Sequence, residues 1–174
     1  MKKILIVDDE PEMCRLLKRI LESEKEYQVF TALNADDAMT LLTSTAMDLV
    51  LSDIRMPGPS GLALADHIKQ HHPDTGIILV SVISDPEELR AALAIGLYGY
   101  ILKPFDCQQV LITVANALRR QELESKERRA RRDLEKEVFT KNIDLKQSSW
   151  EIEQARSDLK TSNRILHEQL LFMQ

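Results

Sequence analysis

The sequence predicts an α/β domain with a doubly wound parallel sheet, followed by one long helix. Apolar runs of strand length alternate with helix-period segments over about the first 120 of the 174 residues. All five glycines and all six prolines lie at or before Pro104. The remaining residues contain neither, are rich in Glu, Lys, Arg, Gln, Leu and Ser, and therefore favour an uninterrupted helix.

Each element follows from a local pattern. Near-continuous apolar runs, as a sheet buried on both faces requires, predict strands at 3–8 (KILIVD), 27–32 (YQVFTA), 48–53 (DLVLSD), 77–82 (IILVSV) and 98–102 (YGYIL). Helix-period segments predict helices at 11–23, 35–45, 61–72 and 86–95, and a last helix from Asp106. Pro11 and the stretch "SDPEE" are N-terminal helix signals. Crossovers of this length suit right-handed βαβ units, hence a doubly wound fold.

Composition excludes several classes of protein. A net charge of only −5 does not indicate a nucleic-acid binder. Cys14 and Cys107 lie too far apart for a metal-ligand motif and are expected to be reduced thiols. No apolar stretch has the length of a signal peptide core or a membrane span. We therefore expect a soluble, cytoplasmic protein without direct nucleic-acid or membrane binding.

Polar residues interrupt the apolar pattern where the predicted strands end, namely at Asp8, Asp9, Asp53, Ser81 and Lys103. In an open α/β sheet these carboxyl ends meet at one edge, where ligands bind. Three clustered carboxylates require either a raised pKa or a divalent cation, and hard oxygen ligands at a shallow edge suit Mg²⁺. A lysine and a hydroxyl opposite them would bind a phosphoryl group. The pattern thus predicts a carboxylate that acts as a nucleophile towards phosphorus.

The stretches "ILIVDDEP", "DLVLSDIRMPGPSGL", "IILVSV" and "GLYGYILKPF" resemble the receiver domain of two-component response regulators. The resemblance covers about residues 1–120 and implies the flavodoxin-like strand order 2-1-3-4-5. It implies that Asp53 is the phosphoacceptor, that Asp9 is a direct ligand of Mg²⁺ (or Mn²⁺) and that Asp8 acts through water. Asp53 and the backbone carbonyl of Arg55 complete the implied metal ligands.

The same resemblance implies a switch. Ser81 is similar to the hydroxyl residue that closes on the phosphoryl group, Tyr100 to the aromatic switch residue, and Lys103 to the family's lysine. The Lys103–Pro104 bond resembles one that is cis in the family. The implied reaction is phosphoryl transfer from the phosphohistidine of a sensor kinase or phosphotransfer protein to Asp53. Ser81 and Tyr100 then move and reshape the face formed by the fourth helix, the fifth strand and the fifth helix.

Two residues depart from the commonest family pattern. Val82 stands where alanine is usual, and Leu97 stands where "GAxGY" has alanine. Both add bulk near Tyr100, so the extent of its rotation is left open.

Two related folds fit less well: a flavodoxin would need a hydroxyl- and glycine-rich phosphate loop after the first strand, and a haloacid-dehalogenase-type phosphatase would need an aspartate at the position of Arg55.

The long helix carries a heptad repeat. One apolar series recurs every seven residues: Val138, Leu145, Ile152, Leu159, Leu166 and Met173. The companion series is mostly polar: Glu135, Asn142, Ser149, Arg156, Asn163 and Leu170. This pattern predicts a weak, left-handed, parallel coiled-coil homodimer, with a phase slip near Ala130. We expect a receiver domain at 1–120 and a coiled-coil signalling helix at 121–174, continuous with the last receiver helix.

Three functions are compatible with this organisation. The first is a phosphorylation-controlled switch that signals through a dimeric coiled coil to an output module absent from this chain. The second is a constitutive coiled-coil scaffold in which phosphorylation alters partner docking. The third is the regulatory N-terminal part of a larger cyclase, phosphodiesterase or kinase, because the chain stops in mid-helix at "LLFMQ" and a truncated protein is expected. No separate catalytic domain is visible, although a receiver promotes its own phosphorylation and dephosphorylation.

Overall fold

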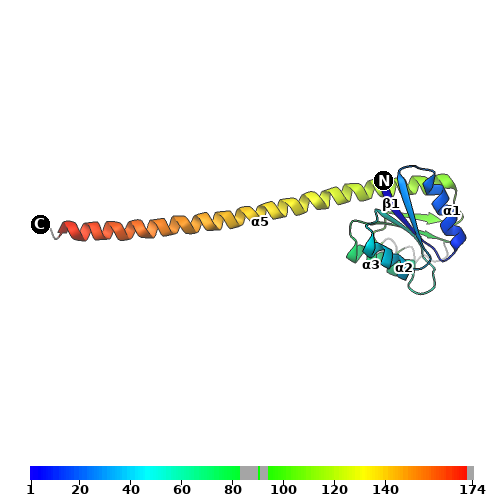
Figure 1. The fold of residues 1–174 in the computed structure, drawn as a ribbon, viewed down its shortest axis with the longest axis horizontal. Helices are drawn as coiled ribbons and strands as arrows, with labels where there is room; N and C mark the ends of the chain where they lie inside the picture. Colours follow the sequence, from blue (N-terminus) through cyan, green and yellow to red (C-terminus); the bar gives the residue numbers. More distant parts are fainter. Residues whose placement is uncertain (83–89, 91–93, 172–174) are drawn as a thin grey trace. The chain divides into compact units, whose positions relative to one another are not determined.

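The computed structural model describes residues 1–82, 90 and 94–171, with residues 166–171 described by their backbone alone (Figure 1). The elements in chain order are β1 (Lys2–Val7), α1 (Pro11–Glu22), β2 (Tyr27–Ala32), α2 (Ala35–Ser44), β3 (Leu49–Asp53), α3 (Gly61–His71), β4 (Gly76–Ser81), β5 (Gly99–Leu102) and α5 (Cys107–Leu171). Most of the helix predicted at 86–95 lies outside the described residues.

The strands form one parallel sheet in the order β2-β1-β3-β4-β5, which confirms the predicted topology. The register brings the ends of neighbouring strands together: Val7 pairs with Ser52, and Asp53 pairs with Val80. Residues that follow β1, β3 and β5 therefore meet at the same edge of the sheet, as the sequence predicts.

Alternate residues of each central strand enter two different cores. Ile4 and Ile6 of β1 pack with side chains of α1 and the first turns of α5 in one cluster. Leu5 and Val7 pack with side chains of α2 and α3 in the other; Figure 1 shows these two helices next to each other. Because side chains alternate across a strand, this arrangement requires apolar residues at consecutive positions. The unbroken run "ILIV" satisfies that requirement.

Polar side chains define where several helices begin. The Asn34 side-chain oxygen accepts the Asp37 N–H at 2.8 Å in front of α2. The Asp106 carboxylate accepts the Gln109 N–H at 2.7 Å, so α5 begins at Cys107, close to the predicted start. Such caps bind N–H groups that have no partner within the helix.

Gly61 allows α3 to begin directly against the end of β3. Its N–H donates to the Ile54 carbonyl at 3.0 Å. A Cβ atom at this position would overlap the Asp53 carbonyl oxygen and lie 2.9 Å from the Asp53 carbonyl carbon. Only glycine permits this approach between helix and strand, which fixes the backbone of the residue predicted to react.

The chain divides into two compact units, Met1–Lys126 and Glu127–Gln174. In the second unit Val138, Leu145, Ile152 and Leu159 are each more than half exposed. The Leu166 side chain and the whole of Met173 lie outside the described residues. The long helix is confirmed, whereas the coiled coil needs a second helix and stays a prediction. Among the residues described, no helix is both long enough and apolar enough to cross a membrane.

Candidate functional site

One ammonium group joins two buried carboxylates at the carboxyl edge of the sheet. Lys103 Nζ lies 3.0 Å from Asp8 Oδ2 and 2.9 Å from Asp53 Oδ1. Asp8 is 1% exposed and Asp53 is 8% exposed. The three residues come from the ends of β1, β3 and β5, so the sheet topology alone brings them together. The lysine charge offsets the repulsion between the two carboxylates.

Backbone groups hold the other oxygens of these carboxylates. The Glu10 N–H donates to Asp8 Oδ1 at 2.9 Å, and the Arg55 N–H donates to Asp53 Oδ2 at 2.9 Å. Each donor lies two residues after the aspartate that it binds, in the loop that follows the strand. Both carboxylates are therefore fixed in orientation before any ligand binds.

The charge state of Lys103 follows from this geometry. Burial by itself lowers the pKa of Lys103, but hydrogen bonds to Asp53 and Asp8, together with the attraction of their charges, raise the pKa above its ordinary value. The ammonium form is thus maintained at neutral pH, and the site contains a permanent positive charge facing Asp53.

The predicted metal ligands fit a hard divalent cation in part. Asp8 and Asp53 direct carboxylate oxygens to one common point, now taken by Lys103 Nζ, while Asp9 is exposed to solvent. Within the described ranges, no three or more His, Cys, Asp or Glu side chains are arranged to hold a metal ion. Mg²⁺ requires only one or two protein carboxylates and keeps several waters. The carboxylate chemistry of Asp8, Asp9 and Asp53 therefore suits Mg²⁺, whereas the oxygens of Asp8 and Asp53 bind Lys103 and backbone N–H groups in this structure.

The predicted switch residues lie near the site in different environments. Ser81 is buried at the end of β4, and its hydroxyl donates to the Val82 carbonyl at 3.3 Å. Tyr100 is half-buried and packs, with Leu97, against a small cluster formed by Ile54 and Leu79. Ile54 directly follows the predicted phosphoacceptor, so the Tyr100 cluster adjoins the site through the backbone.

Lys103 is followed by a cis peptide bond to Pro104, as the resemblance predicts. Val82 is 62% exposed, so its extra bulk lies largely in solvent. Leu97, by contrast, contributes its bulk to the packing around Tyr100. Of the two departures from the family pattern, Leu97 contacts the Tyr100 cluster and Val82 does not belong to it.

One buried residue beside the site has no role in the sequence prediction. Cys14 Sγ lies 3.5 Å from the Asp8 carbonyl oxygen and 3.7 Å from that of Ala32. Burial, and then the charge of Asp8, raise the pKa of this thiol above its ordinary value. A protonated, buried thiol is a poor nucleophile, so the role of Cys14 beneath the site is packing and not catalysis. Its position on the apolar face of α1 is the only sequence signal for this placement.

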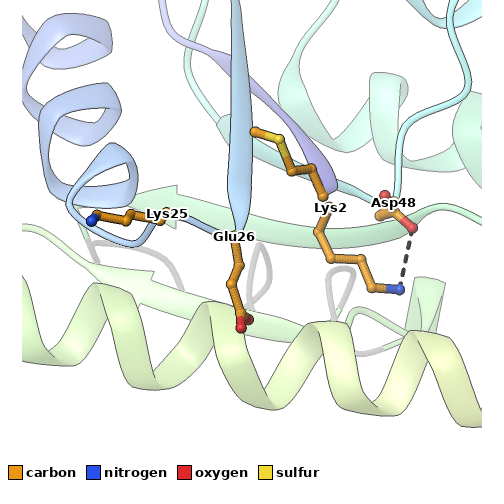
Figure 2. Close-up of a pocket in the computed structure, with 5 residues that line it drawn as sticks. Lys2, Lys25, Glu26 and Asp48 are labelled. Carbon is orange, nitrogen blue, oxygen red and sulfur yellow. Dashed lines mark hydrogen bonds and ion pairs between the residues drawn. The ribbon is translucent and has the colours of Figure 1, made fainter.

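A separate cavity of about 580 Å³ lies at the opposite, amino edge of the sheet. Met1, Lys2, Lys25, Glu26 and Asp48 line it. Figure 2 shows Lys2 pointing towards Asp48, with 3.4 Å between Nζ and Oδ1, and Lys25 pointing away. None of the predicted site residues lines this cavity, so it is distinct from the carboxylate–lysine site.

The chain belongs to the response regulator receiver domain family, whose model matches residues 4–115. Receiver domains of this family are generally Mg²⁺-dependent.

Individual relatives agree with this assignment. The chain is 36% identical over 126 residues to the response regulator protein PilR of Pseudomonas aeruginosa, covering 72% of this chain and 28% of PilR. It is 37% identical over 117 residues to the nitrogen assimilation regulatory protein NtrX of Azorhizobium caulinodans, covering 66% of this chain and 26% of NtrX. The chain thus spans about a quarter of the length of these curated relatives, which are two-component regulators.

Solved structures show the same fold. A response regulator receiver domain protein from Clostridium thermocellum has a TM-score of 0.66 and 29% identity, over 71% of this chain and 98% of that one. The structure of NtrX from Brucella abortus in complex with ADP has a TM-score of 0.67 and 32% identity, over 75% of this chain and 29% of that one.

Proposed function

We propose that this receiver accepts a phosphoryl group on Asp53 from the phosphohistidine of a sensor kinase or phosphotransfer protein. The observation that carries the proposal is the buried Asp53 carboxylate, held by the Arg55 N–H and placed 2.9 Å from the Lys103 ammonium. An Asp53 oxygen attacks phosphorus, the P–N bond breaks, and its electron pair stays on the histidine nitrogen. Lys103 stabilises the negative charge on the transferred group.

Asp8, Asp9 and Asp53, with the Arg55 carbonyl, would hold Mg²⁺ at this site. When bound, the cation supplies positive charge that offsets the oxygens of the transferring phosphoryl group. The described residues support this reaction in three ways. The Arg55 backbone N–H orients Asp53, the Asp8 and Asp53 carboxylates keep Lys103 charged, and Ser81 ends β4, the strand that pairs with β3. The Ser81 hydroxyl then exchanges the Val82 carbonyl for a phosphoryl oxygen, a stronger acceptor.

Labelling from a small phosphodonor tests the phosphoacceptor. With radiolabelled acetyl phosphate and Mg²⁺, the full chain should take up acid-labile label, and Asp53→Asn should remove it. Asp36→Asn is the matched control, because Asp36 is an exposed aspartate in the first turn of α2. Chelation of Mg²⁺ should also remove the label. Equal labelling of wild type and Asp53→Asn would contradict the proposal.

We further propose that α5 forms a parallel homodimeric coiled coil that carries the receiver's state to an output module. Support comes from the exposed heptad series of the second unit, whose members Val138, Leu145, Ile152 and Leu159 leave an apolar stripe in water. A second copy of the same helix covers such a stripe in register. The polar companion series makes the pairing weak enough to respond to the receiver.

Sedimentation of the full chain tests the dimer. Ile152→Glu places a charge in the seam and should weaken association by about two orders of magnitude or more. Gln154→Glu, which lies two residues away and off the seam, should leave the association constant unchanged. If both variants sediment like the wild type, the seam is wrong.

Repeating the sedimentation with beryllofluoride, a phosphoryl mimic, separates switch from scaffold. A change in dimer mass, or a change in helix register measured by cross-linking of cysteines introduced along the seam, supports transmission through α5. No change in either, with beryllofluoride bound, favours the constitutive scaffold.

A further inference from the structure

Three side chains connect the segment before β5 to α5. The Tyr98 hydroxyl donates to Glu124 Oε2 at 2.6 Å, and Arg120 Nε donates to Glu124 Oε1 at 2.8 Å. The Arg120 guanidinium carbon also lies 4.7 Å from the centre of the Tyr98 ring. We call Tyr98, Arg120 and Glu124 the latch. All three lie within the first unit, Met1–Lys126.

The latch has a specific connection to the predicted switch. Leu97, which precedes Tyr98, packs its side chain in the same cluster as Tyr100. The Leu97 carbonyl accepts an N–H from Arg120 at 3.2 Å. One residue therefore contacts the switch cluster with its side chain and α5 with its backbone. An alanine at this position, as the family pattern has, would lack the side chain that makes the first contact.

A second attachment of α5 involves no described member of the cluster around Tyr100. Gln121 Nε2 donates to the Asp74 carbonyl at 2.6 Å, and Ser125 Oγ lies 3.4 Å from Asp74 Oδ1. Asp74 lies between α3 and β4, at the amino edge of the sheet and away from Tyr100. This attachment holds the same two turns of helix as the latch, so it provides a matched control.

We propose that the latch conveys the position of Tyr100 to the last receiver turns of α5 by way of Leu97. The inference rests on the proposed function, because it presumes that phosphorylation moves Tyr100. Rotation of Tyr100 changes the surface against which Leu97 packs, and Leu97 in turn displaces the carbonyl bound by Arg120. The hydrogen bond between Tyr98 and Glu124 has a charged acceptor and joins the segment before β5 directly to α5.

Hydrogen exchange of the full chain, read on peptides from residues 118–126, tests the latch with and without beryllofluoride and Mg²⁺. Tyr98→Phe removes the hydroxyl and keeps the ring. It should speed basal exchange about fivefold, since one hydrogen bond to a partly exposed charge is lost. The beryllofluoride-induced difference in these turns should fall to less than about half of the wild-type value. Gln121→Ala, which removes the 2.6 Å bond to the Asp74 carbonyl, should speed basal exchange while preserving that difference.

Leu97→Ala separates coupling from anchoring. It keeps Tyr98, Arg120 and Glu124, so basal exchange should change little, while the beryllofluoride-induced difference is lost. If Tyr98→Phe and Leu97→Ala both keep the wild-type difference, the latch is not the route. If beryllofluoride binds wild type but the turns at 118–126 do not respond, the latch is overturned and the phosphoacceptor proposal stands. If acetyl phosphate and beryllofluoride both fail to modify or bind the wild type, the proposed function itself fails.

Discussion

At Gly61, helix propensity and the structure predict opposite effects of an alanine substitution on the stability of the receiver. Replacing a glycine by alanine in a helix usually stabilises it, by up to about 1 kcal/mol. At Gly61 the added Cβ would overlap the Asp53 carbonyl oxygen and lie 3.0 Å from Ile54 Cα. Both neighbours are backbone atoms of the strand end, so neither yields by a simple side-chain rotation. We expect Gly61→Ala to destabilise the receiver.

The magnitude follows from the contacts. Separating the start of α3 from β3 costs about 1–3 kcal/mol, as in other overpacked interiors. It also weakens the 3.0 Å bond from the Gly61 N–H to the Ile54 carbonyl, at about 1 kcal/mol. After the gain in helix propensity is subtracted, the net loss is about 1–3 kcal/mol. With a urea dependence of about 2 kcal/mol per molar, the unfolding midpoint falls by about 1 M.

Pulse-labelled hydrogen exchange across a urea series measures this midpoint on β1 and β3 peptides, so the long helix does not contribute to the signal. Gly58→Ala is the control. Its φ is +82° and no atom lies within 4 Å of the added Cβ, so it loses about 1–2 kcal/mol to backbone strain without displacing Asp53. Gly61→Ala should also reduce labelling by acetyl phosphate, whereas Gly58→Ala should not. A Gly61→Ala midpoint equal to or above the wild-type value would refute the reasoning.

Two further predictions concern charge. Asp9→Ala should abolish Mg²⁺-dependent labelling but preserve the urea midpoint, because Asp9 is exposed; retained labelling would remove Asp9 from the metal site. Burial, and then the charges of His67 and His71, lower the pKa of His72 below 6.5 in the folded chain. The unfolded chain therefore binds the proton more readily, and the stability contributed by neutral His72 is complete above pH 6.5 and decreases as the pH falls through the lowered folded value. Urea midpoints measured down to mildly acidic pH should fall more steeply for wild type than for His72→Asn, and parallel slopes would contradict the assignment.

Apolar patterning predicts the sheet well because it records burial. The run at 27–32 coincides with β2, whereas β1 and β4 each begin and end one residue before the predicted bounds. Burial of a side chain does not specify which residue makes the last ladder hydrogen bond. Asp8 illustrates the difference: its N–H bonds to the Ala32 carbonyl at 3.3 Å, although it lies outside β1.

Strand-end logic also places Asp8, Asp53 and Lys103 at one edge, since topology decides which ends meet. It does not show that one ammonium bridges both carboxylates, which depends on side-chain torsions. The contact between Tyr98 and Glu124 joins residues 26 apart in sequence and follows no periodic pattern. The role of Gly61 depends on the distance between two backbone segments, and the stretch "PSGL" contains no signal for that distance.

The burial of the Lys103 bridge has a consequence for the response to ionic strength. Salt weakens interactions between exposed charges much more than those between buried ones. The Arg131–Glu135 and Lys141–Glu137 pairs of the second unit are well exposed, at more than half of each side chain, whereas Lys103 and its two aspartates are each 15% exposed or less. Monovalent salt should therefore alter the surface charge pairing of the long helix while leaving the balance around Asp53 almost unchanged. Varying salt at fixed Mg²⁺ thus provides separate control of the two units within one chain.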